Sequence, residues 1–71
     1  MTRPAAFMSA EDIIVAKLRA FLETGSERHL RDARGVVVMQ EGSLDLDALL
    51  QLAESAGVLD PLEQVLAALR Q

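Results

Sequence analysis

The 71-residue sequence contains no cysteine, tryptophan or tyrosine, and these absences narrow what the chain can be. Without cysteine it forms neither a disulfide nor a thiolate metal site. Its single histidine, His29, cannot build a metal site alone, so we expect no metal and no cofactor. Only Phe7 and Phe21 are aromatic, whereas 51% of the residues are hydrophobic, mostly leucine, alanine and valine. This combination favours a bundle of helices.

Long apolar runs are also missing. No segment approaches the roughly 20 apolar residues that a membrane-spanning helix needs. The opening residues, MTRPAAFM, lack the apolar stretch of a signal peptide. The net charge of −4 disfavours general binding to nucleic acid. We therefore expect a cytoplasmic protein that does not associate with membranes and for which nucleic-acid binding is disfavoured.

The pattern of caps and stops predicts four short helices in one domain. Residues 1–8 have no helical period and are expected to form a flexible arm, so the helical domain covers residues 9–71. Ser9 with Asp12, then Asp45 and Asp60, are N-cap candidates, since their side chains can accept hydrogen bonds from free backbone amides. Glycine is the usual helix stop. The expected helices are 10–24, 27–41, 46–56 and 61–70.

These helices define the expected fold as all-α, a small antiparallel bundle of four short helices, because loops of about two to four residues join antiparallel neighbours. One segment gives conflicting signals. Residues 36–39, VVVM, are rich in β-branched side chains and could form a strand. An isolated strand would have no partner, however, and Leu30, Ala33 and Val37 keep a helical spacing. We predict a helix here, with a weak point at Gly35.

Two residues of opposite charge fall among apolar neighbours on the first two predicted helices. Lys17 lies between Ile13 and Phe21 on the helical wheel, and Asp32 lies between Val36 and Met39. Lys17 precedes the turn at residue 25 by about the same distance as Asp32 follows it, so an antiparallel pair places them level. We predict that the two side chains approach each other, with those four apolar residues around them. A structural pair or a snorkelling lysine is the favoured interpretation, and a functional relic is the alternative.

Three segments carry a resemblance to a known family. They are SAEDIIVAKLRAF, SERHLRDARGVV and GSLDLDALLQLAESAGV. Together they resemble the C-terminal helical half of small bacterial nucleotidyltransferase-like proteins, which include abortive-infection type toxins and uncharacterised relatives. The match covers roughly residues 7–60. The resemblance implies that Lys17 and Asp32, with Arg31 as a weaker candidate, correspond to residues beside a nucleotide site.

The catalytic half of that family has no counterpart in the sequence. Such enzymes use a Gly-Ser turn, a helix and two spaced carboxylates that hold Mg²⁺, which neutralises charge in nucleotidyl transfer. Residues 42–47, GSLDLD, contain the same residue types, but they are too close together for an intervening helix. They are better explained as a helix stop followed by the next N-cap. We therefore expect the isolated chain not to be an enzyme.

Three functions are compatible with the sequence. The favoured one is a non-catalytic interaction module that pairs with a second copy, most simply as a dimer, or with a separate protein. The first alternative is a component of a split nucleotidyltransferase that binds nucleotide only with its partner. The second is a weak nucleic-acid binder that uses Arg28, Arg31 and Arg34, which follow one side of the second helix. Acidic neighbours on that helix favour a solvated surface instead.

Overall fold

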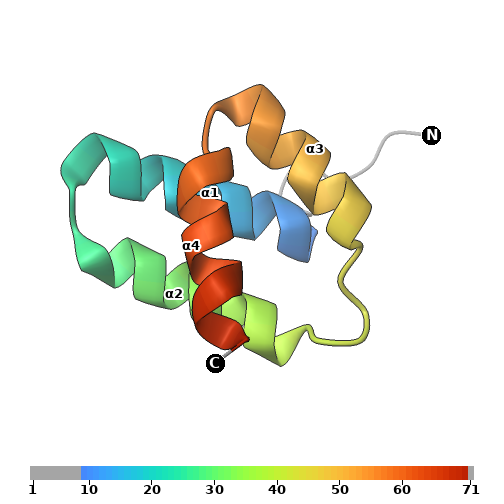
Figure 1. Ribbon diagram of the computed structural model, residues 1–71. Coiled ribbons are helices and arrows are strands. Elements are labelled where there is room, and N and C mark those ends of the chain that lie inside the picture. The colour runs from blue at the N-terminus through green and yellow to red at the C-terminus, as the bar shows by residue number, and fades with distance from the viewer. Residues whose placement is uncertain (1–8, 71) are drawn as a thin grey trace.

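The computed structural model describes residues 9–70, which form four helices (Figure 1). These are α1 (Ala10–Thr24), α2 (Glu27–Met39), α3 (Leu46–Ala56) and α4 (Leu59–Leu69). The predicted all-α bundle is confirmed, and α1 and α3 have the predicted bounds. The predicted arm, residues 1–8, lies outside the described residues.

The possible strand at residues 36–39 is helical in the structure, as we predicted, and α2 runs through Gly35 without a break. The helix ends at Met39, however, rather than at residue 41. Residues 40–43 form a turn, in which Gly42 has a φ of 96°. The helix therefore ends before Gly42, the glycine that follows its predicted end.

Local capping explains where α1 and α3 begin. The Ser9 hydroxyl accepts a hydrogen bond from the backbone N–H of Asp12 at 3.2 Å, and the Asp12 carboxylate accepts one from the backbone N–H of Ser9 at 3.4 Å. Asp45 Oδ1 accepts a hydrogen bond from the backbone N–H of Ala48 at 3.1 Å. Each of these contacts satisfies an amide that has no partner within its helix.

The turn between α3 and α4 follows from Gly57, whose φ is 75°. Its N–H donates to the carbonyl oxygen of Glu54 at 3.2 Å, and the N–H of Val58 donates to that of Ala53 at 2.8 Å. This crossed pair of hydrogen bonds is the Schellman motif, which ends a helix at a left-handed residue. Val58 is almost fully buried, so the turn also contributes to the core.

The predicted start of α4 at residue 61, with Asp60 as its N-cap, is wrong, and the helix ends at Leu69 rather than at residue 70. The helix begins at Leu59, and Val58 occupies the cap position without a side-chain hydrogen bond. The reason is that the buried Val58 already directs its carbonyl oxygen to the N–H of Leu62, at 3.1 Å. Asp60 and Pro61 therefore lie within the first turn, where a proline is tolerated because its missing N–H would have no partner there.

Helix α1 packs against both α2 and α3, and α4 closes the domain by contacting the other three helices. Figure 1 shows α1 and α2 as an antiparallel pair that α4 crosses. The buried core draws on all four helices and the last turn: Ile14, Leu18, Ala33, Val37, Leu49, Ala53, Val58, Leu62 and Val65. None of the helices in residues 9–70 has the length and apolar character to cross a membrane.

A hydrogen bond between distant parts of the chain fixes α3 against the start of α1. Glu11 Oε2 accepts a hydrogen bond from the backbone N–H of Asp45 at 2.8 Å. Two features thus meet at Asp45, because its side chain caps α3 while its own amide is held by α1. No sequence pattern indicated this contact, which joins residues far apart in the chain.

This contact predicts a pH-dependent contribution to stability. The hydrogen bond from Asp45 is the main reason that the pKa of Glu11 lies below its usual value. A carboxylate whose pKa is lower in the folded state stabilises the fold above its unfolded pKa, about 4.3 for glutamate. That contribution is lost as the pH falls through this value toward the folded pKa.

We expect Glu11→Gln to lower the free energy of unfolding at pH 7, with the difference from the unsubstituted chain shrinking below about pH 4.3. Urea melts at a series of pH values measure this. Glu23→Gln, at an exposed position near the other end of α1, is the control. A Glu11→Gln effect that stays constant from pH 7 to pH 3 would contradict the prediction.

Candidate functional site

The predicted approach of Lys17 and Asp32 is confirmed. Lys17 Nζ of α1 lies 3.5 Å from Asp32 Oδ2 of α2. The side chains are 39% and 43% exposed, respectively, so the pair lies at the surface of the α1–α2 seam and not within the core. A half-exposed ion pair of this kind contributes little to stability.

The predicted surroundings of this pair are only partly correct. Ile13, Phe21 and Val36 are half-buried, in keeping with their expected positions. Met39, in contrast, is 82% exposed. It is the last residue of α2, where the chain turns away, so its side chain stays in solvent and does not cover the ion pair.

The exposure of the pair predicts a small coupling energy. In a double-mutant cycle of Lys17→Met and Asp32→Leu, we expect a coupling of about 0.2–1 kcal/mol, which high salt reduces. Denaturant melts measure it, and the cycle of Lys17→Met with Asp47→Leu on α3 is the control that should be additive. A coupling above about 2 kcal/mol would instead indicate a desolvated pair.

The three residues implied by the resemblance do not share one site. Lys17 and Asp32 meet at the α1–α2 seam, whereas Arg31 lines a groove between α2 and α4. The predicted arginine stripe is also divided, because Arg34 lines the same groove and Arg28 does not. All three arginines are exposed.

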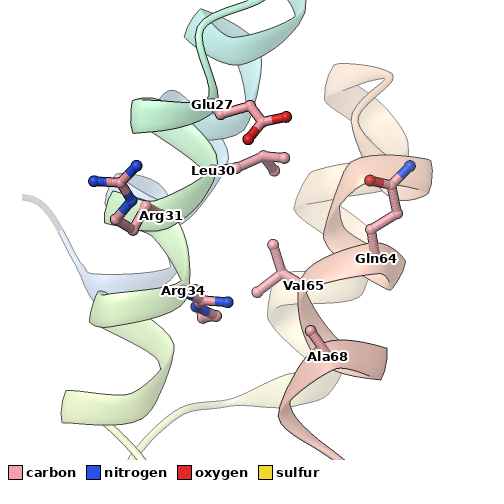
Figure 2. A pocket seen from close by; sticks show the side chains of 7 residues that line it. All are labelled: Glu27, Leu30, Arg31, Arg34, Gln64, Val65 and Ala68. Atoms are coloured by element: carbon pink, nitrogen blue, oxygen red, sulfur yellow. The ribbon is translucent and has the colours of Figure 1, made fainter.

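The groove between α2 and α4 has a volume of about 260 Å³. We call it the α2–α4 groove, and it is lined by Glu27, Leu30, Arg31, Arg34, Gln64, Val65 and Ala68. Figure 2 shows Glu27 and Arg34 extending from α2 toward α4, while the guanidinium of Arg31 points to the other side of α2 in this view. Apolar side chains from both helices thus lie beside the guanidinium of Arg34 and the carboxylate of Glu27.

The same side of α2 and α4 continues into a second hollow near the ends of both helices. It has a volume of about 210 Å³ and is lined by Val37, Val38, Glu41 and Leu69. Val38 and Leu69 are large exposed apolar residues. Helical spacing carries residues 30, 34 and 37 along one side of α2, and Glu41 follows in the turn after the helix. We refer to the groove and this hollow together as the α2–α4 face.

Sequence analysis did not identify this face, because it joins residues of two helices that are distant in the chain. Val65 is indeed buried, but Gln64, Ala68 and Leu69 are exposed beside α2. Only the way α4 crosses α2 brings these residues together. The arginine stripe was the one signal in the sequence that marked part of the face.

His29, the only histidine of the sequence, has one buried polar atom without a partner. Its Nδ1 makes no hydrogen bond among residues 9–70. In the same described part of the chain, no group of three or more His, Cys, Asp or Glu side chains is placed to hold a metal ion.

Comparisons with protein-family models, curated proteins and solved structures find no match to the chain. The similarity to nucleotidyltransferase-like proteins therefore stays a prediction that rests on the three quoted segments.

Proposed function

We propose that the chain is a non-catalytic helical interaction module that binds a protein partner through the α2–α4 face. The observation that carries this proposal is that the exposed apolar side chains of Val38, Ala68 and Leu69 lie on one face with the guanidinium of Arg34. Contiguous apolar surface that remains exposed on a folded domain commonly marks an interface. Arginine is enriched at the centre of such interfaces, where its planar guanidinium pairs with carboxylates.

The lining of this face indicates the chemistry of the partner. The face is balanced in charge, because Arg31 and Arg34 are accompanied by Glu27 and Glu41, and of the two arginines only Arg34 extends toward α4 (Figure 2). A partner segment that is mainly apolar, with a carboxylate within reach of Arg34, would match this lining. The groove is open and smaller than the roughly 300–1,000 Å³ of typical small-molecule pockets, which favours a protein segment as the occupant.

Site-specific photo-crosslinking in cells that produce the chain tests this proposal. A benzophenone side chain replaces Gln64, which lines the groove, or its exposed neighbour Glu63, which does not. We expect a discrete protein adduct from position 64, its loss on Arg34→Glu, and no such adduct from position 63. Equal labelling from both positions, or no adduct from position 64, would contradict the proposal.

The resemblance motivates the alternative of a split nucleotidyltransferase, and it leads to a further prediction. We expect the purified chain to transfer no label from radiolabelled nucleotides in the presence of Mg²⁺, because the sequence lacks the spaced carboxylates of the family's catalytic half. The Lys17→Ala variant is the control. Metal-dependent transfer that Lys17→Ala abolishes would show that the chain is an enzyme.

A further inference from the structure

We infer that the occupant of the α2–α4 face is an amphipathic helix of a partner protein, and that its charged residues follow the order cation, carboxylate, cation at intervals of seven residues. The inference rests on the proposed function, because it names the form and the charge pattern of the segment that binds the same face. Three charges of alternating sign on this face carry it: Glu27, Arg34 and Glu41.

These three charges form a row along the face. They recur at every seventh residue of the sequence. Seven residues are nearly two turns of an α-helix, so Glu27 and Arg34 lie on the same side of α2, about 10 Å apart along its axis. Glu41 lies in the turn after α2 and lines the second hollow. Arg31 is not part of the row, because its guanidinium points to the other side of α2 in Figure 2.

The charges of the row are open to a partner. All three residues are exposed, and the one ion pair among residues 9–70 joins Lys17 to Asp32 at the α1–α2 seam. Unpaired charges beside apolar side chains make a face selective, because a partner that places like charges opposite them is repelled. A partner with a cation, a carboxylate and a cation in that order gains an attractive contact at each position instead.

A helix fits this face better than an extended segment does. Residues 9–70 contain no β-strand whose edge could pair with an extended partner. The face is lined by no aromatic side chain, and Arg34 is the one arginine that extends toward α4, so it has the features of neither a proline-rich-peptide groove nor a phosphate-binding arginine cluster. A helix pairs its own backbone groups and needs only an apolar strip to lie on.

The apolar residues of the face lie along the same direction as the row of charges. Ala68 lines the groove beside Arg34, and Leu69 lines the hollow with Val38 and Glu41. A partner helix with three charges at seven-residue intervals needs about 15 residues, or about 22 Å. The same spacing leaves room between its charges for apolar residues that repeat with the helix, as in a coiled coil.

Two synthetic helical peptides of three heptads test this inference against the full chain. Both have the same apolar strip and the same net charge. The matched peptide carries Lys, Glu and Lys beside the strip at seven-residue intervals. The reversed peptide carries Glu, Lys and Glu there, and the exchanged charges are moved to its far side. We expect the matched peptide to bind about tenfold more tightly in fluorescence anisotropy, with a smaller preference in about 1 M salt.

Reversal of the row should reverse this preference. The row variant carries Glu27→Lys, Arg34→Glu and Glu41→Lys, and we expect it to bind the reversed peptide about tenfold more tightly than the matched one. Circular dichroism shows whether the variant stays helical. If it unfolds, the neutral variant with Glu27→Gln, Arg34→Gln and Glu41→Gln replaces it, and this variant should bind both peptides equally.

Two controls locate the contact and its form. The variant with Arg19→Glu, Glu23→Lys and Glu54→Lys makes the same change in net charge at exposed positions outside the face, and it should keep the original preference. Benzophenone at position 64 should label the matched peptide, whereas benzophenone at position 63 should not. A proline at the centre of the matched peptide should weaken binding about 100-fold, because it breaks a helix.

The outcomes separate this inference from the proposed function. Equal affinity for the two peptides, no binding of either, or a preference that the row variant leaves unchanged overturns the charge order. Full affinity of the proline peptide, or equal labelling from positions 63 and 64, overturns a helix on this face. In each case a discrete protein adduct from position 64 in cells would still support the proposed function. Failure of both peptide binding and crosslinking in cells would contradict both proposals.

Discussion

Leu18→Ala should leave a substantial fraction of the chain unfolded at moderate temperature. Leu18 lies in the middle of α1 and is fully buried within the core shared by the four helices. Truncation of such a leucine costs about 2–5 kcal/mol, because apolar contacts are lost and a cavity remains. A 71-residue domain typically has a total stability of about 4–11 kcal/mol, so the change removes a large part of it.

The control for this substitution lies one turn later on the same helix. Leu22 is 54% exposed, and we expect Leu22→Ala to change the free energy of unfolding by no more than about 0.5 kcal/mol. Thermal melts followed by circular dichroism compare the two variants, with a shift of about 4–8 °C expected for each kcal/mol. Equal shifts for Leu18→Ala and Leu22→Ala would show that α1 does not pack as described.

Two glycine substitutions should have opposite signs. Gly57→Ala is expected to destabilise the domain by about 1–2 kcal/mol, because the φ of 75° disfavours any residue with a Cβ atom. Gly35→Ala should stabilise it by about 0.5–1 kcal/mol, because Gly35 is an exposed residue in the interior of α2. Apart from the adjacent residues and the helix's own backbone, no atom lies within 4 Å of the added Cβ at either position, so the difference isolates backbone conformation.

Urea melts of the two alanine variants test this pair directly. The same chemical change is made at both sites, so a shared effect of composition cancels in the comparison. Effects of the same sign would mean that the Gly57 turn is not left-handed, or that α2 does not continue through Gly35.

The sequence predicts structure well wherever the cause is local. Both ends of α1 were predicted, because Ser9 and Asp12 cap its start and Gly25 ends it with a φ of 73°. The start of α4 was not, although Asp60 and Pro61 match a common start pattern. There the burial of Val58 prevails, and it depends on helices distant in the sequence.

The same distinction between local causes and contacts of distant helices applies to the candidate sites. The meeting of Lys17 with Asp32 could be predicted, because it needs only a short turn and two antiparallel helices. The exposure of these two side chains could not be predicted, because it depends on which parts of α1 and α2 the other helices leave uncovered. The α2–α4 groove was beyond prediction for the same reason. Arg34 and Val65 line it from helices that α3 separates in the chain.

The position of α4 ties binding to local unfolding. This helix is the last of those in residues 9–70, starts without a side-chain cap and supplies Gln64, Val65 and Ala68 to the groove. If α4 detaches while α1 and α2 remain paired, one wall of the groove is lost and the buried Val65 is exposed to water. Any occupant of the groove therefore binds only the closed form, and it must slow amide hydrogen exchange in α4 more than in α1.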